Sequence, residues 1–325
     1  MKRPLSITGM GSISAAGGTV DQVSDAFFST SIKTTQVPEQ SLSETIPYFK
    51  IPVNEEWPQA KELGRPGLLP NLFALIAVQE AIDRAGLTAH DLNSLRIGVC
   101  LGSTVGGTNY QEDFWQNYFK AKPPSIGPVS AYFSSNSAQF ISRHFGLRGP
   151  VLMVNNACTS GADAIGIGAS WLEADLCDVV LCGGTETVLP KIYYGFRSLM
   201  LCSQTPCKPF DRTRTGLTLG EGAGIVVLEK TNTTRNTLAR LVGYGTASDS
   251  FHPTAPHPEA RGLGLAMKSA LSEYGRNLHE IDFVNAHGTA TPHNDLAEGR
   301  WIKKNLNQSR VVATRPALLR RRRTG

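Results

Sequence analysis

The stretch that decides the fold is residues 151–169, VLMVNNACTSGADAIGIGA. Its first four residues are apolar and predict a short buried strand, residues 155–157 predict a turn, and the small residues from Thr159 onward predict a helix. Cys158 would then lie at a helix N-terminus directly after a strand, where unpaired N–H groups and the helix dipole favour a thiolate. Taken alone, however, Cys158 is more simply explained as a small buried cysteine in a helix–sheet contact.

Length and composition indicate an ordinary globular protein. The chain has 325 residues, 41% hydrophobic and 18% charged, which is enough for about two domains or one large α/β unit. The net charge is +5, but residues 310–325 hold six arginines and no acid, and removing those six charges leaves −1. The body of the chain is therefore near neutral, and a nucleic-acid-binding function is not predicted.

The N-terminus and the cysteines bear on location and metal binding. The first eleven residues, MKRPLSITGMG, contain no apolar core of a signal peptide, and no apolar run reaches the length of a membrane span. The six cysteines include the pairs 177/182 and 202/207 but no Cys-x-x-Cys, and Cys182 lies inside an apolar run. We therefore expect no zinc site, no membrane partner and a reducing, cytoplasmic location.

Several further elements follow from local patterns. Residues 5–8 predict a strand that ends in a glycine-rich turn at 9–12, a weak phosphate-loop signal because Ser14 stands where a third glycine belongs. Four prolines make residues 30–63 an irregular surface insertion. A helix is predicted over 70–85, with Pro70 in its first turn and Gly86 as its stop. Buried strands are predicted at 97–101, 178–182 and 225–228.

A faint internal repeat relates the two halves of the chain. Residues 7–12, ITGMGS, are echoed by residues 241–246, LVGYGT. The first copy is followed by helix 70–85 and strand 97–101, and the second by an amphipathic helical stretch at 262–274 and a strand at 281–284. The matching order predicts a duplicated α/β fold with parallel strands.

Two further stretches carry polar residues with chemical potential. His287 follows strand 281–284, at the end of an α/β strand where ligands bind, although alone it is as well explained as a hydrogen-bonded core histidine. Asp295 and Glu298 lie one helical turn apart beyond it, and two interpretations stay open: they orient the loop, or they begin the next helix with favourable negative charge. Between the halves, glycines at 216, 220, 222 and 224 surround Glu221, which predicts a loop whose backbone closely approaches another group.

Three motifs, in this order, resemble the β-ketoacyl-acyl carrier protein synthases of the elongating type: residues 156–161 (NACTSG), residues 209–223 (PFDRTRTGLTLGEGA), and residues 285–298 (NAHGTATPHNDLAE). The resemblance extends from residue 4 to about 314. It implies a thiolase-like duplicated α/β fold with two related βαβ-rich halves, at 1–230 and 231–314, the second incomplete. It also implies a homodimer, or a heterodimer with a related ketosynthase.

The resemblance implies roles for particular residues. Cys158 would be the nucleophile that takes an acyl chain from a carrier-protein thioester, and His287 would stabilise the enolate formed when malonyl-acyl carrier protein loses CO₂. Thr289 and Thr291 would bind the pantetheine arm. The acyl pocket would be lined by Val105 and Gly107, while Glu221, Asp295 and Glu298 would be structural residues near the site. No metal or organic cofactor is implied beyond the phosphopantetheine carried by the acyl carrier protein.

The chain departs from the family pattern after residue 314. There the family continues with a lysine, a Gly-His pair and a glycine-rich helix, whereas residues 315–325 form an arginine-rich tail, RPALLRRRRTG. We expect a truncation or changed reading frame, an exposed sheet edge with poor stability, and a condensation impaired by the missing second histidine. The expected activity is fatty-acid or polyketide/polyene synthesis. The alternative is a non-catalytic ketosynthase-like subunit that dimerises with an intact synthase, and acylation of Cys158 separates the two.

Overall fold

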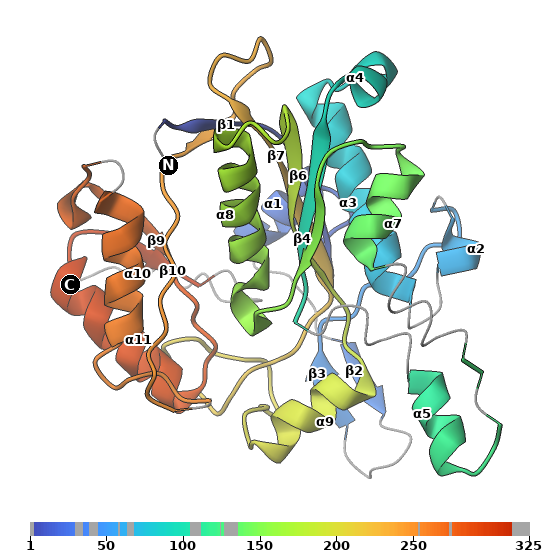
Figure 1. Ribbon diagram of the computed structural model, residues 1–325. Helices are drawn as coiled ribbons and strands as arrows, with labels where there is room; N and C mark the ends of the chain where they lie inside the picture. The colour runs from blue at the N-terminus through green and yellow to red at the C-terminus, as the bar shows by residue number, and fades with distance from the viewer. Residues whose placement is uncertain are drawn as a thin grey trace. The chain divides into compact units, whose positions relative to one another are not determined.

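The computed structural model describes residues 3–29, 35–38, 45–57, 59–63, 68–104, 112–123, 125–126, 136–252, 254–272 and 275–313. Packing divides the chain into two compact units (Figure 1). Unit 1 comprises Met1–Val20, Ile51–Leu189 and Glu221–Val242, and unit 2 comprises Asp21–Lys50, Pro190–Gly220 and Gly243–Gly325. Each unit is therefore assembled from separate stretches of sequence.

Unit 1 is built on a six-stranded sheet in the order β5-β4-β6-β7-β1-β8. The strands are β1 (Leu5–Ser14), β4 (Ile97–Gly102), β5 (Val151–Val154), β6 (Val179–Glu186), β7 (Gly222–Lys230) and β8 (Ala239–Leu241). The pairs β4/β5 and β4/β6 are parallel, whereas β6/β7, β1/β7 and β1/β8 are antiparallel. Within this sheet, the expectation of parallel strands thus holds only for β4, β5 and β6, so the sheet is mixed.

Helices cover both faces of this sheet (Figure 1), and β4 is accordingly buried along its whole length. One face packs against α3 (Leu69–Ala85) and α7 (Ser137–His144), and the other against α8 (Ser160–Glu173). The predicted start and end of α3 are confirmed: a proline occupies its first turn, and Gly86 ends it at φ +67°. The other helices of unit 1 that the structure describes are α2 (Ala60–Leu63), α4 (Ala89–Ser94) and α5 (Glu112–Phe119).

The predicted turn at residues 9–12 is wrong, because β1 continues as a strand to Ser14. A Cβ atom on Gly9 would collide with the carbonyl oxygen of Ala81, and one on Gly11 with that of Ala77. These glycines therefore let the strand lie directly against the backbone of α3. The contact is tertiary, which is why the local sequence suggested a turn.

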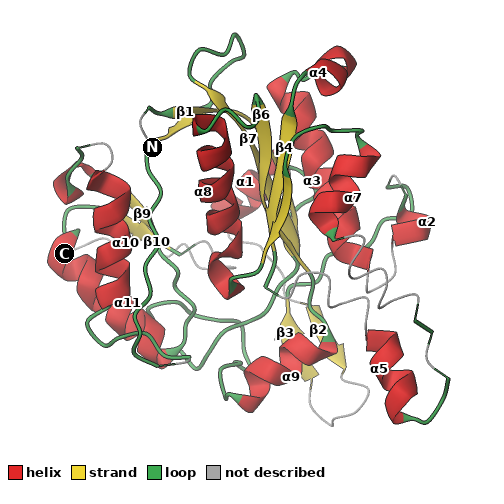
Figure 2. Cartoon of the chain, viewed as in Figure 1, coloured by secondary structure: helices red, strands yellow, loops and turns green. Residues whose placement is uncertain are grey.

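Unit 2 contains α1 (Val20–Ser29), whose first residue belongs to unit 1, and α9 (Pro190–Ser198), α10 (Arg261–Ser272) and α11 (Pro292–Asn305). Its described strands form two small sheets, β2 (Thr35–Pro38) with β3 (Thr45–Tyr48), and β9 (Phe283–Asn285) parallel to β10 (Arg310–Val312) (Figure 2). A short 3₁₀ turn, η4 (Leu278–Glu280), precedes β9. The core of unit 2 lies around Ala286, Ile302 and Leu306.

The internal repeat is visible in how its second copy packs. A Cβ atom on Gly243 would collide with the carbonyl oxygen of Ala270, and one on Gly245 with that of Ala266, both in α10. Gly9 and Gly11 meet α3 in the same way, again at alanines four residues apart. The two copies therefore share one mode of strand–helix packing, although residues 243–246 are not in a strand.

Three expectations about burial need correction. Residues 30–63 are more than a surface insertion, since Phe49 and Ile51 are buried. Strand β5 is not buried: it lies at the edge of the sheet and Leu152 is 41% exposed. Strand β9 begins at residue 283 rather than 281 and is also exposed, because it has one described neighbour, β10. Burial depends on neighbouring strands, which a local apolar run does not reveal.

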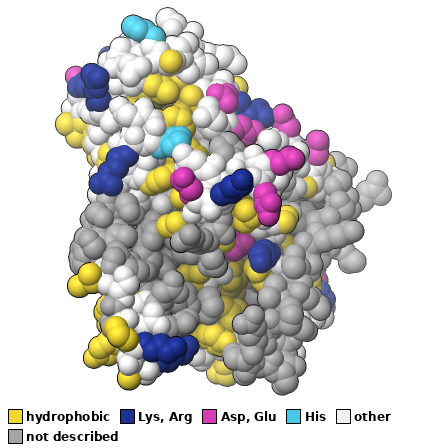
Figure 3. Space-filling view, turned by 90° about the vertical axis from the view of Figure 1, so that its right-hand side faces the viewer, with side chains coloured by type: hydrophobic (Ala, Val, Ile, Leu, Met, Phe, Trp, Pro, Cys, Tyr) yellow, Lys and Arg dark blue, Asp and Glu magenta, His cyan; other side chains and the backbone are white. Residues whose placement is uncertain are grey.

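Hydrophobic side chains reach the surface in several patches of the face that carries α4, α7 and α5 (Figure 3). Trp115, Tyr118 and Phe119 of α5 are among the exposed ones. None of the helices that the structure describes has the length and apolar character that a membrane crossing requires. In the same ranges, no three His, Cys, Asp or Glu side chains lie together as a metal site would need. The arginine-rich tail at 315–325 lies outside the described residues.

Candidate active site

Cys158 lies on a short turn between β5 and α8. The turn contains a single 3₁₀ helix, η3 (Ala157–Thr159), and the Cys158 side chain is exposed. Ser160, the first residue of α8, is buried directly beside it. The predicted order of strand, turn and helix is therefore confirmed, and the thiol is accessible to a reagent or substrate.

Ser103 anchors this turn from the neighbouring strand, β4. Its backbone N–H donates to the carbonyl of Val154, the last residue of β5, at 3.0 Å. Its carbonyl oxygen accepts from Asn155 Nδ2 at 2.9 Å and from Ser160 Oγ at 3.1 Å. The residues before and after Cys158 are thus held by one backbone carbonyl, and Ser103 itself is 4% exposed.

Asp163 holds the same turn from within α8. Its Oδ2 accepts hydrogen bonds from Asn156 Nδ2 and from Thr159 Oγ1, both at 2.7 Å. The Thr159 hydroxyl also lies 2.9 Å from the Asn156 carbonyl oxygen. Asn156 and Thr159 flank the dipeptide of residues 157 and 158, so this buried carboxyl closes the turn around the cysteine.

Ala157 adopts the left-handed backbone conformation, with φ of +49°. This conformation is costly for a residue with a Cβ atom and persists where surrounding contacts impose it. Here those contacts are the bonds to Asp163 and Ser103. The sequence alone gave no sign of this strain, because alanine is not typical of a left-handed position.

The other cysteines are chemically unlike Cys158. Burial raises the pKa of the Cys100 thiol to about 12 and that of Cys177 to about 11. It also raises the pKa of Cys182, which lies in the same core beneath α8, and that of Cys202 to about 11. All six cysteines are free thiols. The four thiols with raised pKa, Cys100, Cys177, Cys182 and Cys202, are held protonated over the physiological range and are poor nucleophiles.

Two further carboxyl groups lie beside the strand ends of unit 1. Glu186, the last residue of β6, accepts from the backbone N–H of Thr104 at 2.6 Å, and burial raises its pKa above the ordinary value. Glu221 accepts from Ile51 N at 3.0 Å and from Thr187 Oγ1 at 2.7 Å. Sequence reasoning placed Glu221 near the site but missed Ser103, Asp163 and Glu186. An acid directly after an apolar strand run was the available signal for Glu186.

In unit 2, Glu298 of α11 holds the loop that carries His287. Glu298 Oε1 accepts from the backbone N–H of His287 at 2.7 Å, and Oε2 from that of Gly288 at 2.9 Å. The His287 side chain is exposed, whereas Gly288 is buried at φ +46°. A Cβ atom on Gly288 would lie 2.6 Å from the Cβ of Ala313 and 3.2 Å from the Phe210 ring, so this position requires glycine.

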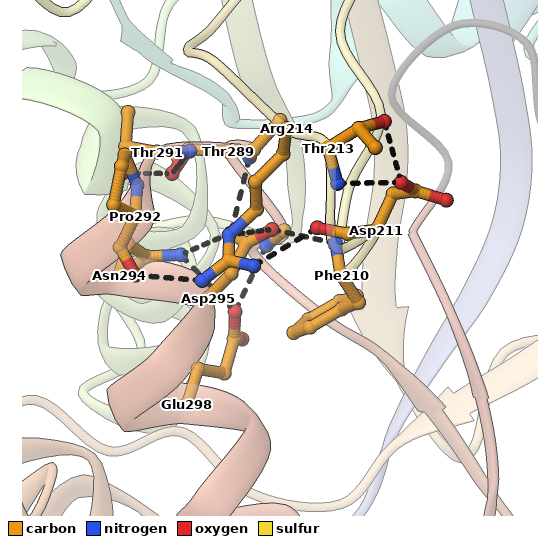
Figure 4. Close-up of polar contacts among 12 residues, drawn as sticks. Phe210, Asp211, Thr213, Arg214, Thr289, Thr291, Pro292, Asn294, Asp295 and Glu298 are labelled. Carbon is orange, nitrogen blue, oxygen red and sulfur yellow. Dashed lines mark hydrogen bonds and ion pairs between the residues drawn. The ribbon is translucent and has the colours of Figure 1, made fainter.

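Asp295 connects the same loop to residues 210–214 (Figure 4). Its Oδ1 accepts from Ala290 N at 3.0 Å and its Oδ2 from Phe210 N at 2.6 Å. Arg214 Nε lies 3.8 Å from Asp295 Oδ2 and has no hydrogen bond within the described part of the chain. The two carboxylates therefore lie in the first turns of α11 and also bond the loop, so both interpretations left open by the sequence describe what is seen.

Thr289 and Thr291 are paired inside this loop. Their hydroxyl oxygens lie 2.8 Å apart, and both residues are buried (Figure 4). Ala290 between them has φ of +63°, a second alanine in the left-handed conformation. The left-handed Ala290 bends the chain between the two threonines, and their hydroxyls lie within hydrogen-bonding distance of each other.

The structure thus gathers the predicted site residues into two groups. Unit 2 brings together His287, Thr289, Thr291, Asp295 and Glu298, while unit 1 holds Cys158 and Glu221. Val105 and Gly107 lie outside the described residues. An exposed thiol on a fixed turn suits nucleophilic catalysis, and a loop with an exposed imidazole beside buried hydroxyls suits binding of a polar substrate arm.

Two family sequence models match this chain. The model described as "Beta-ketoacyl synthase, N-terminal domain" matches residues 71–234, and the one described as "Beta-ketoacyl synthase, C-terminal domain" matches residues 238–318. The first match includes Cys158 and the second includes His287.

Curated relatives and solved structures agree with these matches. The chain is 30% identical to 3-oxoacyl-(acyl-carrier-protein) synthase 2 of Vibrio cholerae over 95% of its own length and 78% of the relative's. It is 34% identical to the protein of the same name from Synechocystis sp. over 72% of its own length and 59% of the relative's. The ishigamide ketosynthase/chain length factor structure superposes with a TM-score of 0.86 at 26% identity, covering 98% of this chain and 82% of that one.

Proposed function

Because this chain belongs to the β-ketoacyl synthase family, we propose that Cys158 accepts an acyl chain from an acyl carrier protein and that the chain is then joined to a malonyl-derived unit. The family has the thiolase-like fold, which agrees with the two repeated strand–helix units. The product would serve fatty-acid or polyketide/polyene synthesis. The observation that carries this proposal is the exposed Cys158 thiol on a turn held from both sides.

In the first step, Cys158 Sγ attacks the carbonyl carbon of an acyl thioester. A new C–S bond forms to Cys158, the bond to the phosphopantetheine sulfur breaks, and that sulfur leaves with the proton that Cys158 gave up. Acyl transfer between two thiols needs no metal or redox cofactor; the phosphopantetheine belongs to the partner. All residues that fix the turn of Cys158 in this step belong to unit 1.

In the second step, malonyl-acyl carrier protein would lose CO₂, and its enolate carbon would attack the acyl carbon on Cys158. A C–C bond forms, and the Cys158 sulfur leaves and recovers a proton. His287 would donate a hydrogen bond to the enolate oxygen, and Thr289 and Thr291 would bind the pantetheine arm. Asp295 and Glu298 would support this loop through the backbone bonds described above. We propose that this step is impaired, because residues 315–325 depart from the sequence with which the family pattern continues.

The edge strand β5 supports a dimer. Among the described strands, β5 pairs only with β4, and Leu152 on it is 41% exposed. A second copy or a related ketosynthase could pair with this edge. The ishigamide structure, named as a ketosynthase/chain length factor, supports the heterodimer alternative, in which this chain serves as a non-catalytic partner. Reaction in the cytoplasm remains part of the proposal.

Mass spectrometry of the chain after incubation with acyl-carrier thioester tests the proposal. We expect one acyl group on the peptide containing Cys158 and none in the Cys158→Ala variant. Ketoacyl product is measured separately after adding malonyl-carrier protein, with His287→Ala as the control for the second step. An unmodified Cys158 together with a stable complex with an intact synthase would instead favour the partner-subunit alternative.

A further inference from the structure

Glu186 is a half-buried titratable residue with no part in the proposed chemistry. It ends β6, at the same end of the sheet as the turn that carries Cys158, since β4 lies between β5 and β6 in the sheet. Burial raises the pKa of its carboxyl group, so placing an acid here has a cost in stability. A leucine or alanine would fill this position without that cost, which suggests that the carboxyl oxygens serve a purpose.

The contacts of Glu186 concentrate on the dipeptide that follows β4. Its Oε2 accepts from Thr104 N at 2.6 Å, and the Ser103 hydroxyl lies 3.3 Å from Oε2 and 3.4 Å from Oε1. Its Oε1 also accepts a long hydrogen bond, 3.4 Å, from Thr187 N. One carboxyl group thus fixes both Ser103 and Thr104.

Ser103 passes this restraint to the turn of Cys158. Its carbonyl holds the side chains of Asn155 and Ser160, one on each side of the cysteine. The backbone of β4 is also in direct contact with that of α8, since a Cβ atom on Gly102 would collide with the backbone carbonyl of Ser160. A shift of residues 103 and 104 must therefore move the first residue of α8 and, with it, the nucleophile.

We propose that Glu186 is a positioning residue for the acylation of Cys158, acting through Ser103 to hold the nucleophile turn in its reactive geometry. The inference deepens the proposed function and rests on it for the acyl-transfer step. Glu186 makes no contact with the thiol that the structure records, so it acts only through other residues. It belongs to a chain of contacts that continues through Thr187 to Glu221.

The first test uses iodoacetamide, a small probe that needs no carrier protein. Its second-order rate at Cys158 is measured by peptide mass spectrometry in the full chain and in Glu186→Ala and Glu186→Gln. We expect the alanine variant to react roughly tenfold more slowly and the glutamine variant to recover at least half of that loss on a logarithmic scale, because glutamine keeps one acceptor oxygen for Thr104. Buried Cys100 in the same sample must stay unlabelled, which shows that the variant is folded.

Glu229→Gln is the matched control. Glu229 is a buried glutamate of the same sheet, bonded to Thr8, Thr233 and Arg235, but it pairs with Val179 at the opposite end of β6. Its loss should lower stability and leave the rate at Cys158 unchanged. Equal rates in the wild type, Glu186→Gln and a folded Glu186→Ala would overturn the proposal, as would an equal slowing by Glu229→Gln. If the alanine variant does not fold, the glutamine variant must still be at least twofold slower for the proposal to stand.

The second test uses acyl-carrier thioester and separates binding from reaction. Because Glu186 acts on the turn and not on the donor, the variants should show a lower maximal acylation rate with an unchanged half-saturating donor concentration. A raised half-saturating concentration at an unchanged maximal rate would contradict the positioning role. If wild-type Cys158 accepts no acyl group at all, the proposed function fails, while the iodoacetamide rates still decide the role of Glu186.

Discussion

The turn that carries Cys158 and the loop that carries His287 are built alike but supported differently. Each connects a strand to a helix, each contains an alanine in the left-handed conformation, and each is bonded to acids of the helix that follows. The turn stands on a six-stranded sheet whose strands β4 and β6 are almost entirely buried. The loop follows β9, in a sheet of two described strands, where Phe283 is 55% exposed and Val311 42% exposed.

The bonds differ accordingly. Asp163 accepts from the side chains of Asn156 and Thr159, both exposed residues, whereas Asp295 and Glu298 accept from backbone N–H groups. In the turn that carries Cys158, the large sheet fixes the backbone, and the carboxyl group of Asp163 orients only side chains. Where the sheet is small, the carboxylates bond the backbone N–H groups of the loop directly, and we expect the loop to depend on them more strongly.

The largest expected effect concerns the thiols of unit 1. In the folded chain at pH 8, iodoacetamide should modify Cys158 at least about 100-fold faster than Cys100 or Cys177, because those two thiols are buried and protonated. Raising the pH toward about 11 ionises Cys177 before Cys100, so the difference in labelling rate between Cys158 and Cys177 should narrow first. Peptide mass spectrometry measures the three rates. Rapid labelling of Cys100 in the folded chain would show that the sheet does not protect the core beneath the turn.

Replacing the carboxyl groups tests the comparison directly. Asp295→Ala leaves the backbone N–H groups of Phe210 and Ala290 without their acceptor and removes the carboxylate that faces Arg214 Nε. We therefore expect a loss of about 3 kcal/mol in the free energy of unfolding. Asp163→Ala frees only side chains that can turn to water, so we expect about 1 kcal/mol. Urea unfolding of both variants gives the two values. Equal losses would remove the distinction between turn and loop.

Adding one methyl group to the loop should have an intermediate effect. Gly288→Ala forces alanine to φ +46° and sets its Cβ 2.6 Å from the Cβ of Ala313, which we expect to cost about 2 kcal/mol. The matched control is Gly86→Ala at the end of α3, where φ is +67° but nothing lies within 4 Å of the added Cβ. Only backbone strain applies there, and about 1 kcal/mol is expected. Thermal unfolding of the pair separates strain from collision, and a larger loss at Gly86 would contradict the tight packing of the loop.

The smallest effect is a pH dependence caused by Glu186. Burial raises the pKa of this carboxyl group in the folded chain, so the folded state holds its proton more tightly than the unfolded state. Its contribution to stability is therefore full below the ordinary glutamate pKa and is lost as the pH rises through the raised value. Glu186→Gln lacks this titration, so the wild type should lose stability relative to the variant as the pH rises from acid to neutral. Urea midpoints measured across that range check the sign, and a constant difference would exclude the titration.

Local signals predicted much of unit 1. Pro70 and Gly86 set the ends of α3 through fixed and left-handed φ angles, and the apolar runs of β4 and β6 fall where they were expected. The β1 glycines were misassigned because their reason lies in the distant alanines of α3. Burial of β5 and β9 was overestimated for a similar reason: an apolar run does not show whether a second strand lies beside it.

The site was predictable in its reactive groups but not in its supports. The local pattern predicted Cys158 at a helix N-terminus after a strand, close to the short 3₁₀ turn where it lies, and the motif order pointed to His287. Ser103 and Asp163 were missed because their function arises from contacts to Asn155, Asn156, Thr159 and Ser160 that the sequence does not display. The roles of Cys158 and His287 themselves stay predictions until acylation and condensation are measured.

The paired glycines have a consequence for building chimaeras of this protein. Gly9 and Gly11 touch the α3 backbone, and Gly243 and Gly245 touch that of α10, at alanines with the same spacing. Each glycine pair should therefore be inherited from the same parent as the helix that it touches. A crossover between the pair and its helix would set a side chain against a backbone carbonyl or leave a gap in the packing. Recombination points should therefore lie between Gly86 and Leu241. Each parent then contributes a glycine pair together with the helix against which that pair packs.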